Sequence, residues 1–401
     1  MHILRQVPWA RHSRCRIGTR PIWVLLAFST FYALALLCFQ SISHRDPSSV
    51  FFDASRAYNP LYSAHRAEQA ERYITSINQS GRHVVNNNEP PLLCLGIATV
   101  ARRGTQYVRN TVGSFFAGLS EEERDSIFFD LFVAHSDPAK HPIFAEHWLD
   151  VLPDRILQYP KDTAEFDQVR AWEEGGWYRN KSIYDYRYLL RDCYDTGAPY
   201  VAMVEDDTLA VQGWFGRLLD ALATVKVKMN GYPSDQRWLY LRLFYTDELL
   251  GWNSEQWTTY LFWSFVVWIS LLTMMLATRR RFPTQLEFLT NEMIAAICLR
   301  LHPGDGPLVL PGREADNDAA SVRRFVFPRD MVPDVLDKLR IETKGLVDMQ
   351  IEKIADVGGY VRWAVVPPIL QHTGGTSSKG HGFDDNARRT WSFRFEQYPY
   401  D

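Results

Sequence analysis

The sequence predicts an α/β fold in which helices flank a mostly parallel sheet. Apolar runs at residues 92–100, 127–134 and 199–204 suit strands that are buried on both faces. Helical patterns at residues 107–119 and 181–194 lie between these runs. Strands that alternate with helices are typical of βαβ units, whose strands run parallel. A shorter strand is predicted at residues 155–159.

The composition excludes some classes of protein. With 401 residues, of which 46% are hydrophobic, the chain can bury a large core. A net charge of -3 gives no sign of the basic surface that is typical of a nucleic-acid-binding protein. The five cysteines lack the spacing of a zinc site. Cys94 and Cys193 pair if the domain lies in an oxidising compartment, but the alternative, two free buried thiols, is slightly favoured.

The N-terminal residues indicate a membrane anchor followed by a stem. Residues 1–20 carry arginines and no acid, which predicts a cytosolic tail. Residues 21–40 are uncharged and long enough to span about 30 Å of hydrocarbon as a signal-anchor helix. A cleaved signal peptide is the alternative, but a small-residue cleavage site is lacking. Residues 41–90 are polar and predict a lumenal stem, with an N-glycosylation sequon at Asn78.

Three acids end the third predicted strand. Glu205, Asp206 and Asp207 follow the run at residues 199–204. Open α/β sheets bind ligands at the carboxyl ends of their strands, and clustered carboxylates repel one another unless a cation lies between them. The functional interpretation is therefore a divalent cation bound to a diphosphate. A solvated acidic turn is the alternative, and it is the commoner outcome for three acids taken alone.

Other strand ends are expected to reach the same crevice. Thr99 lies at the end of the first predicted strand, Arg103 follows it, and Asp137 follows the second. Because parallel strands end at one edge of a sheet, these side chains are candidates for binding a nucleotide beside the acids. Arg103 is the candidate for a second positive contact to phosphates. A surface salt bridge is an equally good interpretation of that arginine.

The order of three motifs resembles that of GT-A glycosyltransferases. The motifs are IATVARR at residues 97–103, VEDD at 204–207 and QHTG at 371–374. The set is similar to the Golgi family that adds N-acetylgalactosamine to the first mannose of GPI anchors. It is more distantly similar to the N-acetylglucosaminyltransferase IV enzymes of complex N-glycans. The resemblance covers residues 91–256 and 325–401, and it implies a GT-A-like (Rossmann-type) sheet in a Golgi membrane protein.

The resemblance also implies a chemistry and a set of roles. A UDP-sugar is the donor, Mn²⁺ or another divalent cation neutralises the leaving diphosphate, and a GPI glycolipid or GPI-anchored protein is the acceptor. Asp207 and His372 are the candidate metal ligands, while Glu205 and Asp206 assist through the ribose or through water. A lone histidine is otherwise as well explained by a structural role.

The family is inverting, and an inverting transferase needs a general base. A strand predicted from residue 238 ends in Asp247 and Glu248, which are the candidates for that base. The spacing does not choose between them. An acidic junction between a strand and a loop is an equally good interpretation.

The same family carries transmembrane segments inside its catalytic domain. Residues 257–281 contain twenty uncharged residues followed by three arginines, which predicts an inserted transmembrane helix with a cytosolic end. A second crossing is then required, because a bilayer cannot separate His372 from the acids. The candidate within residues 282–324 is interrupted by an arginine, a proline and an aspartate. This stretch has either diverged or been altered by a faulty gene model, and residues 325–401 resume the domain.

Alternative functions remain open at the level of sequence. One is an N-glycan transferase of the N-acetylglucosaminyltransferase IV type. Another is a catalytically inactive relative that binds a nucleotide without transferring the sugar. The third is a membrane scaffold in which the acids form a solvated turn.

Overall fold

The computed structural model describes residues 19–46, 49–80, 90–102, 104–245, 257–283, 324–340, 346–374 and 390–399. The chain divides into two compact units. One comprises Met1–Ala54 and Trp252–Pro311, and the other comprises Ser55–Gly251 and Gly312–Asp401. The second unit contains the sheet.

Two long helices dominate the described part of the first unit. Helix α1 (Thr19–Ile42) covers the predicted anchor, whose membrane role stays a prediction. Helix α10 (Trp257–Arg281) covers the predicted inserted segment. Among the described residues, one segment, Leu261–Arg281, is long and apolar enough to cross a membrane, with a mean hydropathy of 1.9. The second crossing predicted within residues 282–324 lies almost wholly outside the described residues.

The second unit is built on a seven-stranded sheet with the order β3-β2-β1-β4-β7-β6-β8. Its strands are β1 (Leu93–Thr99), β2 (Ile127–Val133), β3 (Arg155–Leu157), β4 (Tyr200–Glu205), β6 (Trp238–Arg242), β7 (Phe325–Pro328) and β8 (Val361–Ala364). Neighbouring strands are parallel except at β7, which is antiparallel to β4 and β6. The prediction of a mostly parallel sheet is confirmed. A separate two-stranded ribbon pairs β5 (Thr208–Ala210) with β9 (Leu370–His372).

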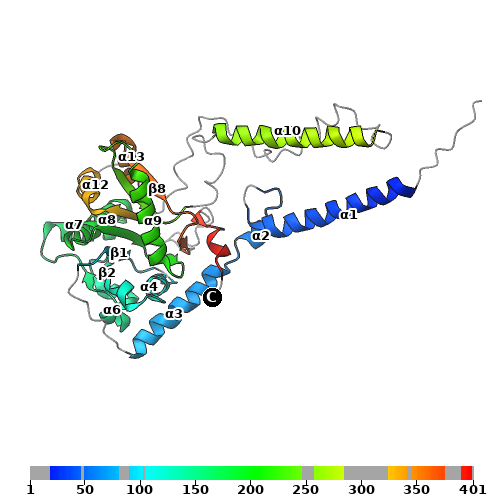
Figure 1. Cartoon of the computed structure of the whole chain (residues 1–401). Coiled ribbons are helices and arrows are strands. Elements are labelled where there is room, and N and C mark those ends of the chain that lie inside the picture. Colours follow the sequence, from blue (N-terminus) through cyan, green and yellow to red (C-terminus); the bar gives the residue numbers. More distant parts are fainter. Residues whose placement is uncertain are drawn as a thin grey trace, which may run out of the picture. The chain divides into compact units, whose positions relative to one another are not determined.

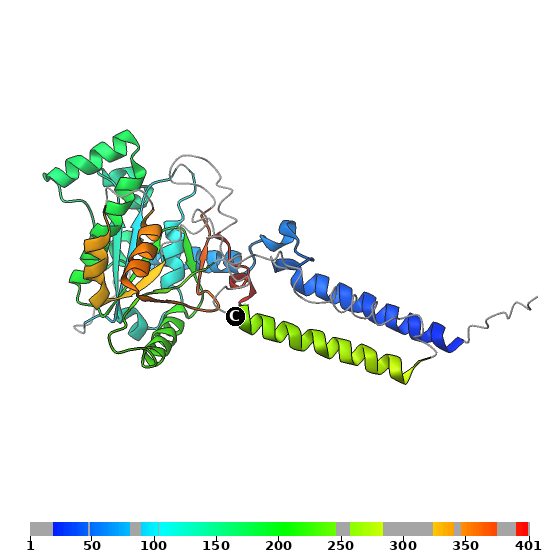
Figure 2. The same cartoon turned by 90° about the horizontal axis from the view of Figure 1, so that it is seen from above.

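Helices cover both faces of the sheet (Figures 1 and 2). One face carries α3 (Tyr62–Ser80), α4 (Val108–Phe116), α6 (Trp148–Val151) and α9 (Trp214–Met229). The other carries α7 (Ala164–Gly175), α8 (Tyr178–Asp195), α12 (Val332–Lys338) and α13 (Val347–Gly358). The shorter helices are η1 (Ser43–Arg45), α2 (Ala54–Ala57), α5 (Glu121–Asp125), η2 (Pro138–Lys140), η3 (Pro142–Ala145), η7 (Arg329–Met331) and η9 (Phe395–Gln397).

Helix α3 lies within the segment for which the sequence predicts a stem. Its apolar side chains, among them Ile74 and Ile77, are buried with the residues of α4 and the sheet. Residues 62–80 are therefore part of the folded body, because the helix packs one apolar face against α4.

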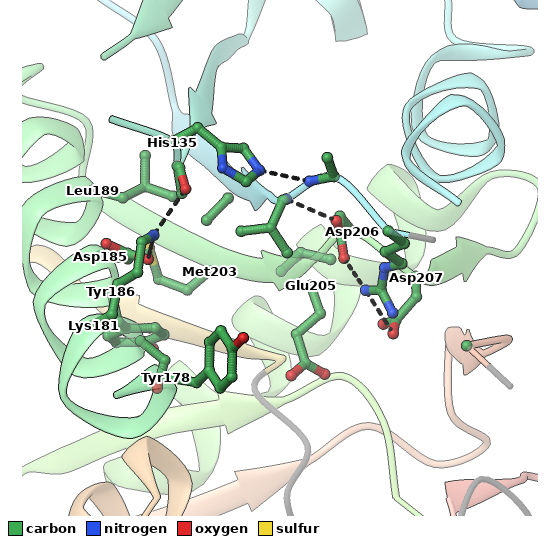
Figure 3. Close-up of a pocket in the computed structure, with 18 of the residues that line it drawn as sticks. His135, Tyr178, Lys181, Asp185, Tyr186, Leu189, Met203, Glu205, Asp206 and Asp207 are labelled. Atoms are coloured by element: carbon green, nitrogen blue, oxygen red, sulfur yellow. Dashed lines mark hydrogen bonds and ion pairs between the residues drawn. The ribbon is translucent and has the colours of Figure 1, made fainter. Parts of the chain in front are cut away.

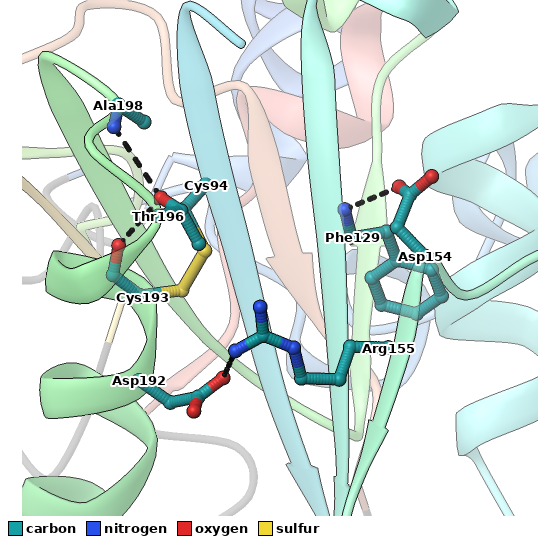
Figure 4. Close-up of a disulfide and its surroundings, with 8 residues drawn as sticks. All are labelled: Cys94, Phe129, Asp154, Arg155, Asp192, Cys193, Thr196 and Ala198. Carbon is teal, nitrogen blue, oxygen red and sulfur yellow. Dashed lines mark hydrogen bonds and ion pairs between the residues drawn. A yellow bond between two sulfur atoms is a disulfide. The ribbon is translucent and has the colours of Figure 1, made fainter. Parts of the chain in front are cut away.

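Strand β1 explains how the two helical layers are held together. Successive side chains of a strand point to opposite faces, so Leu95 packs toward one layer and Cys94 toward the other. Cys94 forms a disulfide with Cys193 of α8, with a Cα–Cα distance of 5.6 Å (Figure 4). The preference for two free thiols is therefore wrong. The sequence alone could not place the end of α8 beside β1, because that contact joins residues far apart in the chain.

A buried carboxyl group accompanies this disulfide. The carboxyl group of Asp130 in β2 lies within 4.8 Å of both sulfur atoms. Burial, followed by the nearby Asp192, raises the pKa of Asp130 to about 9. Because the two sulfur atoms are bonded to each other, we interpret this group as part of the core and not as a metal site.

Candidate functional site

A cavity of about 530 Å³ opens at the carboxyl ends of β1, β2 and β4. Its size is within the range of roughly 300–1,000 Å³ that is typical of small-molecule sites. Glu205, Asp206 and Asp207 line one end, while Lys181 and Asp185 of α8 line the other (Figure 3). The cavity is therefore acidic at one end and has a mixed polar wall at the other.

Asp206 is held by the end of β1. Thr99 Oγ1 donates to Asp206 Oδ2 at 2.8 Å, and the guanidinium group of Arg102 donates to Oδ1. Burial raises the pKa of Asp206, while Arg102 opposes that rise. The side chain is a fixed part of the wall, because both of its oxygens are already bonded to the protein.

Asp207 is surrounded by three cationic or potentially cationic groups. Its Oδ2 lies 3.1 Å from Arg102 Nη2 and 3.4 Å from His372 Nε2, and its Oδ1 lies 3.7 Å from Arg324 Nη2. Burial alone would raise the pKa of Asp207, but His372, Arg102 and Arg324 outweigh it and hold the pKa well below the usual range. Asp207 is therefore ionised at any physiological pH.

The β5–β9 ribbon brings His372 to the acids. Thr208 pairs with His372, and Thr373 N donates to the carbonyl oxygen of Asp207 at 2.9 Å. The ring Nδ1 of His372 lies 3.0 Å from Thr390 Oγ1, which leaves Nε2 directed toward Asp207. The part of the chain after residue 324 thus completes the site that begins at the end of β4.

Gly374 follows β9 by two residues and lies close to Asp207. A Cβ atom built on Gly374 would lie 2.7 Å from Cγ and 2.9 Å from Cβ of Asp207, which is closer than real Cβ contacts. Only glycine fits there without moving the carboxylate.

Two histidines support the β1 side of the cavity. Ile143 N donates to Nδ1 of His141, so Nε2 carries the proton and faces Thr99 Oγ1 at 3.0 Å. Burial, followed by the neighbouring His135, lowers the pKa of His141 to about 4. His135 accepts a hydrogen bond from Ala101 N at 2.7 Å. Neutral His141 thus orients the Thr99 hydroxyl toward Asp206.

Lys181 organises the opposite wall. Its ammonium group donates to Ala134 O, Tyr159 Oη and Asp185 Oδ2 at 2.7–2.8 Å. Tyr159 also donates to Asp185. All three donors of Lys181 are used, so this buried cluster is a rigid wall of the cavity and needs no ligand to satisfy it.

The structure brings five of the sequence-predicted residues together: Thr99, Glu205, Asp206, Asp207 and His372. Asp137 is exposed and lines a neighbouring cavity with Lys140 and Glu173. Asn78 lies in α3, where its Oδ1 accepts a hydrogen bond from Trp148 N. Arg103, Asp247 and Glu248 lie outside the described residues.

Sequence reasoning missed Arg102, Arg324 and Gly374. Arg102 stands next to the selected Arg103, and local spacing gives no way to choose which of the two side chains turns inward. Arg324 is a single arginine before an apolar strand and has no motif around it. The quoted motif at residues 371–374 includes Gly374, but its contact with Asp207 depends on tertiary structure.

Residues 93–302, slightly more than half of the chain, match the model of the GPI-N-acetylgalactosamine transferase PGAP4 family. The chain belongs to this family. Its members form a glycosyltransferase family whose acceptor is the GPI glycolipid or a GPI-anchored protein. None of the curated proteins matches the chain. The matched range includes β1 and the acidic cluster, whereas Arg324, His372 and Gly374 lie beyond its end.

The donor atoms around Asp207 fit a divalent cation. A carboxylate and an imidazole are ligands that Mn²⁺ accepts. Asp207 Oδ2 and His372 Nε2 lie 3.4 Å apart and both residues line the cavity, so the two donor atoms are close enough to share one ion. The absence of a side chain at Gly374 keeps the face of the carboxylate open.

Proposed function

We propose that this chain is a Golgi membrane glycosyltransferase with a lumenal, GT-A-like catalytic domain. It transfers N-acetylgalactosamine from a UDP-sugar to the mannose of GPI anchors. A divalent cation is held by Asp207 and His372. The observation that carries the proposal is the approach of His372 Nε2 to Asp207 Oδ2 at 3.4 Å, at the acidic end of a cavity of nucleotide-sugar size.

The charge balance of the acidic end supports a diphosphate ligand. Two of the three carboxylates are paired with Arg102, whose Nη2 lies between Asp206 and Asp207. A cation bound there acts as a Lewis acid that stabilises the negative charge developing on the leaving diphosphate. The guanidinium group of Arg102 contributes a fixed positive charge at the same place.

The transfer itself requires a base on the acceptor side. In an inverting displacement, the acceptor oxygen forms a bond to the anomeric carbon while the bond from that carbon to the diphosphate oxygen breaks. The proton of the acceptor hydroxyl goes to a carboxylate, for which we propose Asp247 or Glu248. Both come shortly after β6 in the sequence, which ends at Arg242.

The membrane and lumenal parts of the proposal have their own support. Helix α10 contains a segment that can cross a bilayer, which would keep a lipid-linked acceptor near the enzyme. The Cys94–Cys193 disulfide is typical of proteins in an oxidising compartment such as the secretory pathway.

Thermal unfolding with UDP and Mn²⁺ tests the donor site. We expect UDP to raise the melting temperature of the whole protein only when Mn²⁺ is present, and we expect Asp207→Asn to remove this effect. Asp220→Asn is the matched control, because Asp220 is exposed on α9 and does not line the cavity. Release of UDP from UDP-N-acetylgalactosamine with a mannose-containing GPI glycan then separates an enzyme from an inactive binder. A wild-type protein that UDP and Mn²⁺ leave unchanged would contradict the proposal.

A further inference from the structure

Arg324 links the C-terminal part of the chain to the acidic cluster. Its carbonyl oxygen accepts a hydrogen bond from Leu243 N at 3.1 Å, just beyond the end of β6. The side chain is 0% exposed. It is one of the largest fully buried side chains among the described residues, and it lies under the carboxylates that line the cavity.

The guanidinium group of Arg324 is hydrogen-bonded through Nε and faces two carboxylates with Nη2. Its Nε donates to Thr208 Oγ1 at 2.6 Å, and its central carbon lies 4.9 Å from the centre of the Phe244 ring. Its Nη2 lies 3.4 Å from Glu205 Oε2 and 3.7 Å from Asp207 Oδ1. In the described part of the chain, neither η nitrogen has a hydrogen-bond partner.

Stability alone does not explain a charge in this position. Burying an arginine is costly, and replacing a buried ion pair with apolar groups often leaves stability unchanged or improves it. The two η nitrogens also lack the hydrogen bonds that would compensate for the loss of water. Such a group is therefore more readily explained by what it does to Glu205 and Asp207 than by its contribution to folding.

The geometry indicates what Arg324 does to Asp207. Arg324 lies on the Oδ1 side of this carboxylate, whereas Arg102 and His372 lie on the Oδ2 side. Attraction from Arg324 thus holds Oδ1 toward the interior and turns Oδ2 toward His372. Thr373 fixes the backbone of Asp207 at the same time, because its N–H and its hydroxyl both donate to the Asp207 carbonyl.

We propose that Arg324 is a positioning residue that fixes the carboxylates of Glu205 and Asp207, so that Asp207 Oδ2 and His372 Nε2 face a common cation. The inference rests on the proposed function. It adds a residue from beyond the family match to the machinery of the site.

The direction in which cation affinity changes when Arg324 is removed distinguishes positioning from simple charge repulsion. If Arg324 acted only through its charge, removing it would strengthen the binding of a cation nearby. If it positions the carboxylates, removing it must weaken that binding. Outer ligands of this kind typically change metal affinity by about 10–100-fold.

The experiment is a titration of the full-length protein with Mn²⁺, followed by electron paramagnetic resonance of free and bound ion. We expect Arg324→Met to raise the Kd for Mn²⁺ by about tenfold or more and to change the spectrum of the bound ion. Arg324→Lys keeps the charge but loses the planar fork, so its Kd should lie between those of the wild type and Arg324→Met. The matched control is Arg124→Met. Arg124 is also buried, and its side chain forms an ion pair with Asp154 at 3.0 Å. It lies at the amino end of β2, away from the cavity, so the Kd of Arg124→Met for Mn²⁺ should equal that of the wild type.

If Arg324→Met does not fold, Thr208→Val tests the positioning role of Arg324 instead. This change removes the acceptor for Nε while keeping the charge and the volume, so a smaller rise in Kd is expected. An Arg324→Met or Thr208→Val protein that is folded and binds Mn²⁺ as tightly as the wild type, or more tightly, overturns the positioning role alone. A wild-type protein that binds no Mn²⁺ overturns both this role and the proposed cation site.

Discussion

Asp207 is the residue on which the charges of the site converge. It is in contact with His372 and Arg102 on one oxygen and near Arg324 on the other. The three groups come from three distant parts of the chain, so the carboxylate is sensitive to small displacements of each. Its position is further limited by Gly374, where a Cβ atom would clash with the Asp207 side chain.

Gly374→Ala is expected to weaken Mn²⁺ binding by about tenfold or more while leaving the fold intact. The added methyl group would lie 2.7 Å from Asp207 Cγ, and the Asp207 backbone cannot retreat because Thr373 binds it. The measurement is the Kd for Mn²⁺ together with the melting temperature. Gly216→Ala on α9 is the control, since no atom lies within 4 Å of its added Cβ and alanine favours a helix by about 0.5–1 kcal/mol. Unchanged Mn²⁺ binding in Gly374→Ala would argue against Asp207 as a ligand.

Residue-level prediction from the sequence succeeded where the side chains follow a strand directly. Thr99 and Glu205–Asp207 were placed correctly at the edge of the sheet, because the carboxyl ends of parallel neighbours must meet. The choice of Arg103 over its neighbour had no such support, and Arg102 is the one seen at the acids. Arg324 gave no signal, because its contact with Glu205 joins the residue before β7 to the end of β4, which is far away in the sequence.

At the scale of elements, sequence patterns recovered the central strands and the edge strand β3, but missed the edge strand β8 and the β5–β9 ribbon. Strands β1, β2 and β4 were predicted nearly residue by residue, because buried parallel strands are continuous apolar runs. Strands β5, β8 and β9 were not predicted. Strands β5 and β9 have three residues each, and they are defined by pairing with each other across a long stretch of sequence. The position of His372 follows from that pairing and not from any local pattern.

The Cys94–Cys193 disulfide should contribute stability without affecting the site. It joins β1 to α8 across 99 residues of sequence, so its loss frees a long loop in the unfolded chain. We expect the double change Cys94→Ala and Cys193→Ala to lower the free energy of unfolding by about 2–5 kcal/mol. Urea denaturation measures this, and Mn²⁺ affinity should remain unchanged because Cys94 lies near the amino end of β1. Cys38→Ala, which removes an exposed free cysteine of α1, is the control. Equal stability of the double variant and the wild type would contradict the expectation.

At the scale of the whole molecule, the second unit (Ser55–Gly251 and Gly312–Asp401) is interrupted in sequence but forms one compact body. Strands β6 and β7 are neighbours in the sheet, and Leu241 pairs with Val326, although residues 243–324 lie between the two strands in the chain. Sequence reasoning inferred that the two parts must meet, because a bilayer cannot divide one site. It could not show how, since the antiparallel pairing of β7 with β4 and β6 is decided by packing at long range.

This continuity predicts that the second unit folds without the segments outside it. Removing residues 1–54 and replacing residues 252–311 with a Gly/Ser linker of roughly eight residues leaves Ser55–Gly251 and Gly312–Asp401. The linker lies shortly after Leu243 and shortly before Arg324 in the chain. Because Leu243 and Arg324 share a backbone hydrogen bond of 3.1 Å, a short linker can join the two parts without straining the sheet. The loss of the exposed apolar side chains of α1 and α10 should make the shortened protein soluble without detergent.

We expect this shortened protein to melt cooperatively and to bind Mn²⁺ with a Kd within about threefold of the full chain, a difference of less than 1 kcal/mol. All described side chains of the acidic cluster are retained in it, including Arg324 and His372. The same protein carrying Asp207→Asn is the control and should bind no Mn²⁺. A shortened protein that folds but does not bind Mn²⁺, while the full chain does, would mean that the removed residues help to build the site, and the carboxylates would then depend on those residues as well as on Arg324.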